Sequence, residues 1–178
     1  ERIDKTLFEH NRKRFIEQLD PKSIAIFTSN DIITTSADST MPFEQHRDIF
    51  HLSGIDQEES ILIIFPDCHL KKHREVLFLK ETSEMIAIWE GQKYTKETAY
   101  ETSGIKTVYW LDQFEKVFKS LMHEAETVYL NSNEHNRANT EAETREDRFN
   151  KWCKAEFPVH EYKRSAPIMH QIRSVKHQ

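Results

Sequence analysis

The chain has 178 residues and a formal net charge of −5 at pH 7, which suits one domain with a single hydrophobic core and no basic nucleic-acid surface. Its 3 glycines form no phosphate-binding loop, and no apolar run approaches the ~20 residues of a membrane-spanning helix or forms a secretory signal at the start. Cys68 and Cys153 form no Cys-x-x-Cys pair, and two distant cysteines fit a cytoplasmic protein with reduced thiols better than a disulfide scaffold. From the charge and the apolar pattern, we expect it to bind neither nucleic acid nor a membrane.

The first half of the chain predicts one helix followed by several strands. Asp4 can cap a helix of roughly fifteen residues that ends before Pro21, with Phe8 and Phe15 on its apolar side and Arg12 opposite. Residues 43–50 can be extended, and Gly54 marks the turn after them. Apolar runs predict four strands, the second of them covered on both faces: 23–27, 61–65, 75–79 and 86–89. The polar stretch 67–74 predicts a loop.

The second half of the chain alternates strands with helices. Thr95 can begin a short helix through Tyr100, with Gly104 at its C-terminal cap, and Asp112 can cap a second helix with a clear apolar stripe. Further segments complete the pattern: strands at 105–110 and 127–130, a charged helix-prone stretch at 134–157, and a last segment comprising 162 and 168–175. This alternation predicts a single α/β domain across residues 1–178.

Three blocks of the sequence belong together. The first contains a polar turn around Asp38, an aromatic-x-Gln step that ends at Gln45, and the segment 48–54, which starts with Asp and closes on Gly. The second is a Trp-x-Gly motif at Trp89, and the third is an Arg-x-x-Lys motif formed by Arg173 and Lys176. In this order, the blocks resemble the N-terminal domain of Xaa-Pro aminopeptidase, also called aminopeptidase P. The chain departs from that pattern at 44 and 51, where it has Glu and His, so contacts at those two positions are not transferred.

The resemblance implies a fold and a role for the chain. The fold would be a mixed sheet of about six strands with helices on both faces, of the ribonuclease H-like type found in creatinase and aminopeptidase P N-terminal domains. The parent enzyme would remove the first residue of peptides with proline second, using two manganese ions held by two Asp, one His and two Glu in a pita-bread domain beyond Gln178. This domain would itself hold no catalytic or metal-binding residue. It would shape peptide access and help to build a homo-oligomer, either a dimer or a tetramer.

The resemblance also implies where functional contacts lie. Asp38 and Trp89 are candidates for the substrate entrance or a subunit contact, although Asp38 can equally cap a turn and Trp89 can equally pack in a core. Arg173 and Lys176 lie at the expected junction with the domain's main partner, its own C-terminal catalytic domain. Two alternatives stay open: a peptide- or histone-binding pseudo-peptidase domain without catalysis, and the N-terminal domain of a prolidase or creatinase relative.

Two other groups of residues carry less weight. Cys68, His69 and His73 could suggest a metal site, but the lysines and arginine between and after them would repel a cation, and a site needs three or four ligands. The pair Glu58 and Glu59 could suggest acid–base chemistry, but neighbouring side chains on an extended chain point to opposite faces, so the sequence favours a solvated turn.

Overall fold

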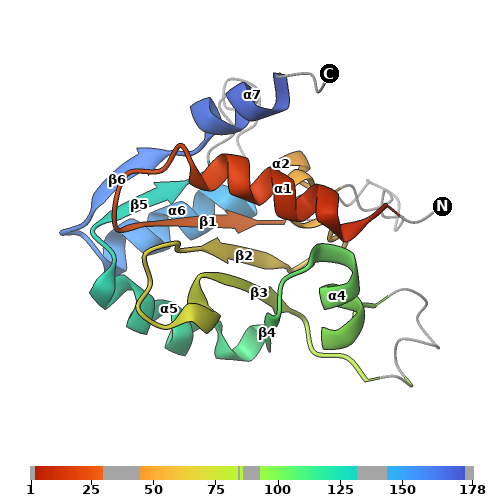
Figure 1. Cartoon of the computed structure of the whole chain (residues 1–178). Coiled ribbons are helices and arrows are strands. Elements are labelled where there is room, and N and C mark those ends of the chain that lie inside the picture. Colours follow the sequence, from red (N-terminus) through yellow and green to blue (C-terminus); the bar gives the residue numbers. More distant parts are fainter. Residues whose placement is uncertain (1–2, 30–44, 84, 86–92, 132–143, 175–178) are drawn as a thin grey trace, which may run out of the picture.

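A six-stranded mixed sheet organises the chain, for which the computed structural model describes residues 3–29, 45–83, 85, 93–131 and 144–174 (Figure 1). The strands run in the order β4-β3-β2-β1-β5-β6. β2 is antiparallel to both of its neighbours, and the other strand pairs are parallel. The strands are β1 (Ser23–Thr28), β2 (Ile61–Ile64), β3 (Glu75–Leu79), β4 (Thr107–Trp110), β5 (Thr127–Leu130) and β6 (Glu161–Arg164). The strand expected at 86–89 lies outside the described residues.

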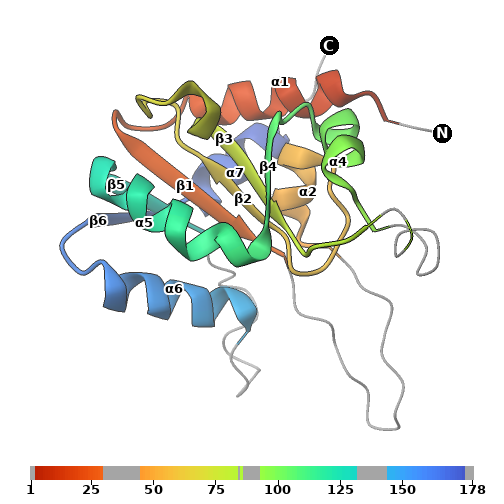
Figure 2. The same ribbon diagram turned by 90° about the horizontal axis from the view of Figure 1, so that it is seen from below.

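Helices cover both faces of this sheet, as predicted (Figures 1 and 2). One face carries α1 (Lys5–Ile16), α2 (Arg47–Ser53), α4 (Lys96–Ser103) and α7 (Ala166–Ser174), and the other carries α5 (Phe114–Glu124) and α6 (Arg145–Glu156). Two short 3-10 helices lie in connections: η1 (Lys71–His73) precedes β3, and η2 (Leu111–Gln113) joins β4 to α5. No helix in the described part of the chain has both the length and the apolar character needed to cross a membrane.

The alternation of side chains along each strand divides the core into two layers. Phe27, Leu62 and Leu77 point toward α1, α2 and α7, whereas Ile26, Ile63 and Val76 point toward α5 and α6. The central strands are therefore buried on both faces, which explains why β2 is apolar at every position.

The helix ends predicted at Asp4, Thr95 and Gly104 are confirmed by their cap geometry, and the turn predicted at Gly54 proves to be a helix end as well. The Asp4 side chain accepts a hydrogen bond from the Thr6 backbone N–H at 3.0 Å, and Thr95 forms a reciprocal capping box with Thr98. Gly54 and Gly104 end α2 and α4 in the left-handed conformation, with φ of 72° and 80°. A Cβ at Gly54 would also lie 2.4 Å from the Phe8 ring, so this position needs glycine for two reasons.

The prediction that 43–50 is extended is wrong, because Arg47–Ser53 forms α2. Two side chains of α1 bind the carbonyl groups at the end of this short helix: Arg12 Nη1 donates to Leu52 O at 2.8 Å, and Asn11 Nδ2 donates to His51 O at 2.9 Å. Arg12 is only 1% exposed, so its predicted place on the solvent side of α1 is also wrong. These bonds satisfy carbonyls that a helix leaves unpaired at its C-terminus.

Three smaller differences concern the connections. Residues 67–74 contain η1 rather than loop alone, and Asp112 lies inside η2, so that α5 starts without a side-chain cap. The last segment includes β6, a mostly exposed strand that the sequence did not predict. β6 pairs with β5, and this pairing satisfies backbone N–H and C=O groups of the strand. The strand therefore forms although its polar sequence does not indicate one.

Candidate functional site

A buried polar network lies where β1 and β5 end. The two strands are parallel and in register, with Ile26 opposite Leu130, so their carboxyl ends meet at one edge of the sheet. Ser29 and Asn131, which come directly after these strands, are 1% and 5% exposed. Polar side chains gathered at the carboxyl ends of neighbouring parallel strands form the usual position for a site in an α/β fold.

Asp48 is the centre of this network. It lies in the first turn of α2 and is 4% exposed. One carboxylate oxygen accepts a hydrogen bond from Asn131 Nδ2 at 2.8 Å, and the other forms an ion pair with Arg173 of α7. The Asn131 carbonyl in turn accepts a hydrogen bond from Asn150 Nδ2 of α6 at 2.9 Å. One carboxylate thus ties together helices from both faces of the sheet.

His46 extends the network toward α6. Its Nδ1 accepts a hydrogen bond from the Asp48 backbone N–H at 3.2 Å and so caps α2. Its Nε2 lies 3.1 Å from an oxygen of the buried Glu146 carboxylate and 3.2 Å from Asn131 Nδ2. His46 therefore bridges the starts of α2 and α6.

The ion pair of Arg173 with Asp48 fixes α7 against the rest of the domain. Burial and the neighbouring Arg47 guanidinium lower the pKa of Arg173, but an arginine remains protonated at neutral pH. The Arg173 side chain is 22% exposed and that of Asp48 is 6% exposed, so the carboxylate neutralises a mostly buried charge. This contact fixes the last turn of α7 to the first turn of α2.

Gln45, the last residue of the aromatic-x-Gln step, has a structural role. Its Nε2 donates to the carbonyls of Ile55 and Gln57 at 2.9 and 3.2 Å, and its Oε1 accepts from the His46 backbone N–H at 2.9 Å. These bonds hold the turn after α2 against the residue that caps the start of α2.

The structure describes only part of the predicted site. Arg173 lies in the network, whereas Asp38, Trp89 and Lys176 lie outside the described residues. The sequence alone did not identify Asp48 as the partner of Arg173, nor the further members of the network: Asn131, His46 and Glu146. A usable signal existed for Asp48 alone, because it opens the Asp-to-Gly segment 48–54 of the first block.

The two weaker sequence candidates separate in space. Glu58 bonds to Lys93 at 2.7 Å and Glu59 lies 3.3 Å from Lys80, so they do not face one site. The bond from Lys93 lowers the pKa of Glu58, which keeps its carboxylate ionised and unsuited to proton transfer near neutral pH.

His73, which the sequence analysis considered together with Cys68 and His69, contacts a different residue. Its Nε2 lies 2.9 Å from the Tyr109 hydroxyl, and burial lowers the pKa of His73 and keeps the ring neutral.

The sheet order and the helices on both faces define a three-layer α/β domain. The charged groups of its polar network pair with one another and hold helices and strands together. Residues 8–129 match the sequence model of the family described as "Aminopeptidase P, N-terminal domain", which shows that the chain belongs to this family.

Curated relatives agree with this assignment. The chain is 25% identical over 127 residues to an Xaa-Pro aminopeptidase of Escherichia coli, an alignment covering 71% of the chain and 29% of that protein. It is 24% identical over 106 residues to human Xaa-Pro aminopeptidase 3, covering 58% and 21%. It is 39% identical over 57 residues to intermediate cleaving peptidase 55 of Saccharomyces cerevisiae, covering 32% and 11%. The chain thus spans less than a third of each of these proteins.

Solved structures share the fold. A Bacillus anthracis protein assigned to aminopeptidase P superposes with a TM-score of 0.86 at 25% identity, over 98% of this chain and 41% of that protein. An Asp260Ala variant of Escherichia coli aminopeptidase P superposes with a TM-score of 0.76 at 21% identity, over 99% and 40%. The six-stranded fold expected from the resemblance is confirmed.

Proposed function

We propose that the chain is the non-catalytic N-terminal domain of a cytoplasmic Xaa-Pro aminopeptidase, an enzyme that releases the first residue from peptides with proline second. The match of residues 8–129 to the family carries the proposal. A following catalytic domain would hold two manganese ions, which activate water and polarise the scissile carbonyl. The buried network around Asp48 supports the division of labour, because its charged groups are committed to holding elements together.

The domain would act by limiting access and by making contacts. Arg173 and Lys176 would form the junction with the catalytic domain, and the Asp48 ion pair supports this by fixing the last turn of α7. Asp38 and Trp89 would face the peptide entrance or a neighbouring subunit in a homodimer or homotetramer.

The alternatives differ in their support. The relatives described above are Xaa-Pro aminopeptidases and an intermediate cleaving peptidase, which favours the proposal over a prolidase or creatinase relative. A pseudo-peptidase that binds peptides or histones would share this domain and differ in the catalytic one. A measurement of peptidase activity in the complete protein therefore distinguishes an Xaa-Pro aminopeptidase from a pseudo-peptidase.

The 178-residue chain by itself should not hydrolyse an Xaa-Pro peptide. Incubation with a tripeptide that has proline second and with Mn²⁺ should release no more of the first residue than a blank without protein, because the proposed metal ligands belong to another domain. Free amino acid is measured by chromatography, and a peptide with alanine second is the substrate control. Release above the blank that a chelator abolishes would contradict the assignment of this domain as non-catalytic.

A further inference from the structure

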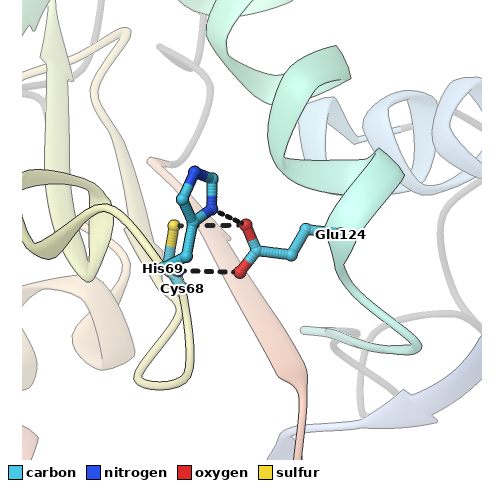
Figure 3. Close-up of side chains that lie close together, drawn as sticks. All are labelled: Cys68, His69 and Glu124. Atoms are coloured by element: carbon cyan, nitrogen blue, oxygen red, sulfur yellow. Dashed lines mark hydrogen bonds and ion pairs between the residues drawn. The ribbon is translucent and has the colours of Figure 1, made fainter.

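A second group of side chains, remote in sequence from the network around Asp48, gathers beside the end of α5 (Figure 3). Cys68 and His69 lie in the turn after β2, and Glu124 is the last residue of α5. Cys68 Sγ, a ring nitrogen of His69 and a carboxylate oxygen of Glu124 all lie within 4.8 Å of one another. Cys68 and His69 are neighbours in the sequence, whereas Glu124 is brought to them by the fold.

The contacts among the three residues orient their donor atoms toward one point. His69 Nδ1 lies 2.5 Å from Glu124 Oε1, and the His69 backbone N–H donates to Glu124 Oε2 at 2.8 Å. Cys68 Sγ lies 3.9 Å from the same Oε1. Around a tetrahedral zinc ion, ligand atoms lie about 3.3 Å apart for N and O and about 3.5 Å apart for S and O, from the usual bond lengths. Shifts of less than about 1 Å would therefore bring all three atoms into coordination distance.

The geometry points to a binding site for one divalent ion of the zinc type, held by Cys68 Sγ, His69 Nδ1 and Glu124, with water as the fourth ligand. Thiolate, imidazole and carboxylate are the donors that zinc accepts, whereas Mg²⁺ and Ca²⁺ prefer oxygen donors alone. On binding, the ion replaces the thiol proton, and the neutral His69 ring coordinates through Nδ1 with its own proton on Nε2. A thiolate and a carboxylate then balance its two positive charges.

The local field favours a cation at this place. The C-terminus of α5 carries the negative end of the helix dipole, and Glu124 lies in its last turn. Lys71 and Lys72, which argued against a metal in the sequence, are exposed on η1, where water and salt screen their charges. Arg74 directs its Nε to the Cys68 carbonyl at 2.9 Å and so holds the turn in place.

The exposure of the three ligands suits a site that is open to solvent and anchored by one buried residue. The His69 and Glu124 side chains are 76% and 29% exposed, whereas Cys68 is 1% exposed. An ion can therefore enter from solvent and reach a sulfur held in the core. This site is independent of the proposed aminopeptidase function, since none of its residues belongs to the network around Asp48.

Cobalt provides a direct readout, because a thiolate bound to Co²⁺ gives a charge-transfer band in the near ultraviolet. The reduced 178-residue chain, titrated with Co²⁺ without oxygen, should develop this band to one equivalent, and Zn²⁺ should abolish it. Cys68→Ser should remove the band. His69→Gln and Glu124→Gln, both at partly or fully exposed positions, should weaken Co²⁺ binding by about tenfold or more.

Two matched variants are controls for these changes. Cys153→Ser removes the other buried thiol, whose Sγ lies 3.8 Å from the Tyr162 hydroxyl, and His73→Gln removes a histidine committed to Tyr109. Both should keep the band and the affinity. No band in the unmodified chain, a band that survives Cys68→Ser, or one that Cys153→Ser removes would overturn the site. If Cys68→Ser does not fold, unchanged affinity in His69→Gln and Glu124→Gln would overturn it equally.

Discussion

Replacing Asp48 with asparagine should lower the free energy of unfolding by about 3 kcal/mol, at the lower end of the range for breaking a buried ion pair. The change keeps the size of the side chain but leaves the mostly buried Arg173 charge, whose side chain is 22% exposed, without its counter-charge. Chemical denaturation followed by tryptophan fluorescence measures the loss. The partial exposure of Arg173 places the expected value at the low end.

A matched carboxylate serves as the control for Asp48. Glu59 also pairs with a cation, Lys80, but the two side chains are 46% and 58% exposed, so Glu59→Gln should change stability by less than about 1 kcal/mol. Adding Arg173→Met to Asp48→Asn should recover part of the loss, because it removes the unpaired charge. Equal effects of Asp48→Asn and Glu59→Gln would show that the network does not hold the domain together.

Replacing Ile63 with alanine should lower the free energy of unfolding by about 2–5 kcal/mol, the usual cost of a large-to-small change at a buried aliphatic site. Ile63 is 0% exposed in the central strand β2 and lies in the layer that faces α5 and α6. Its neighbours across the sheet are Ile26 on β1 and Val76 on β3. A cavity there has regular sheet on both sides, so the surroundings can close it only in part.

The same substitution at an exposed isoleucine is the control, because it removes the same atoms without opening a cavity in the core. Ile3 is 50% exposed, so Ile3→Ala should change stability by no more than about 0.5 kcal/mol. A cost below that value for Ile63→Ala would mean that β2 is not the centre of the core.

Local patterns predicted most of the elements. The apolar runs indicated β1, β2, β3 and β5, and turn chemistry indicated the ends at Gly54 and Gly104. Each of these signals lies within a few neighbouring residues, where side-chain type and backbone preference act directly. The family resemblance supplied the strand number and the layers, which periodicity alone does not.

The sequence failed where distant residues determine local structure. α2 forms where an extended segment was expected, and its carbonyls are bound by Asn11 and Arg12 of α1, each 40 residues earlier in the chain than the carbonyl it binds. β6 has an exposed, polar sequence and exists because β5 offers it an edge. The Asp48–Arg173 pair joins α2 to α7. Because the two residues are far apart in the sequence, the residues that flank either one do not indicate the contact.

Activity of the complete encoded protein is the most direct test of whether this domain belongs to an enzyme that cleaves Xaa-Pro peptides. The complete encoded protein is loaded with Mn²⁺ and given peptides that differ only in having proline or alanine second. We expect release of the first residue from the proline peptide alone, and loss of that release with a chelator. Peptide binding without any release from the metal-loaded protein would contradict the claim and favour a pseudo-peptidase.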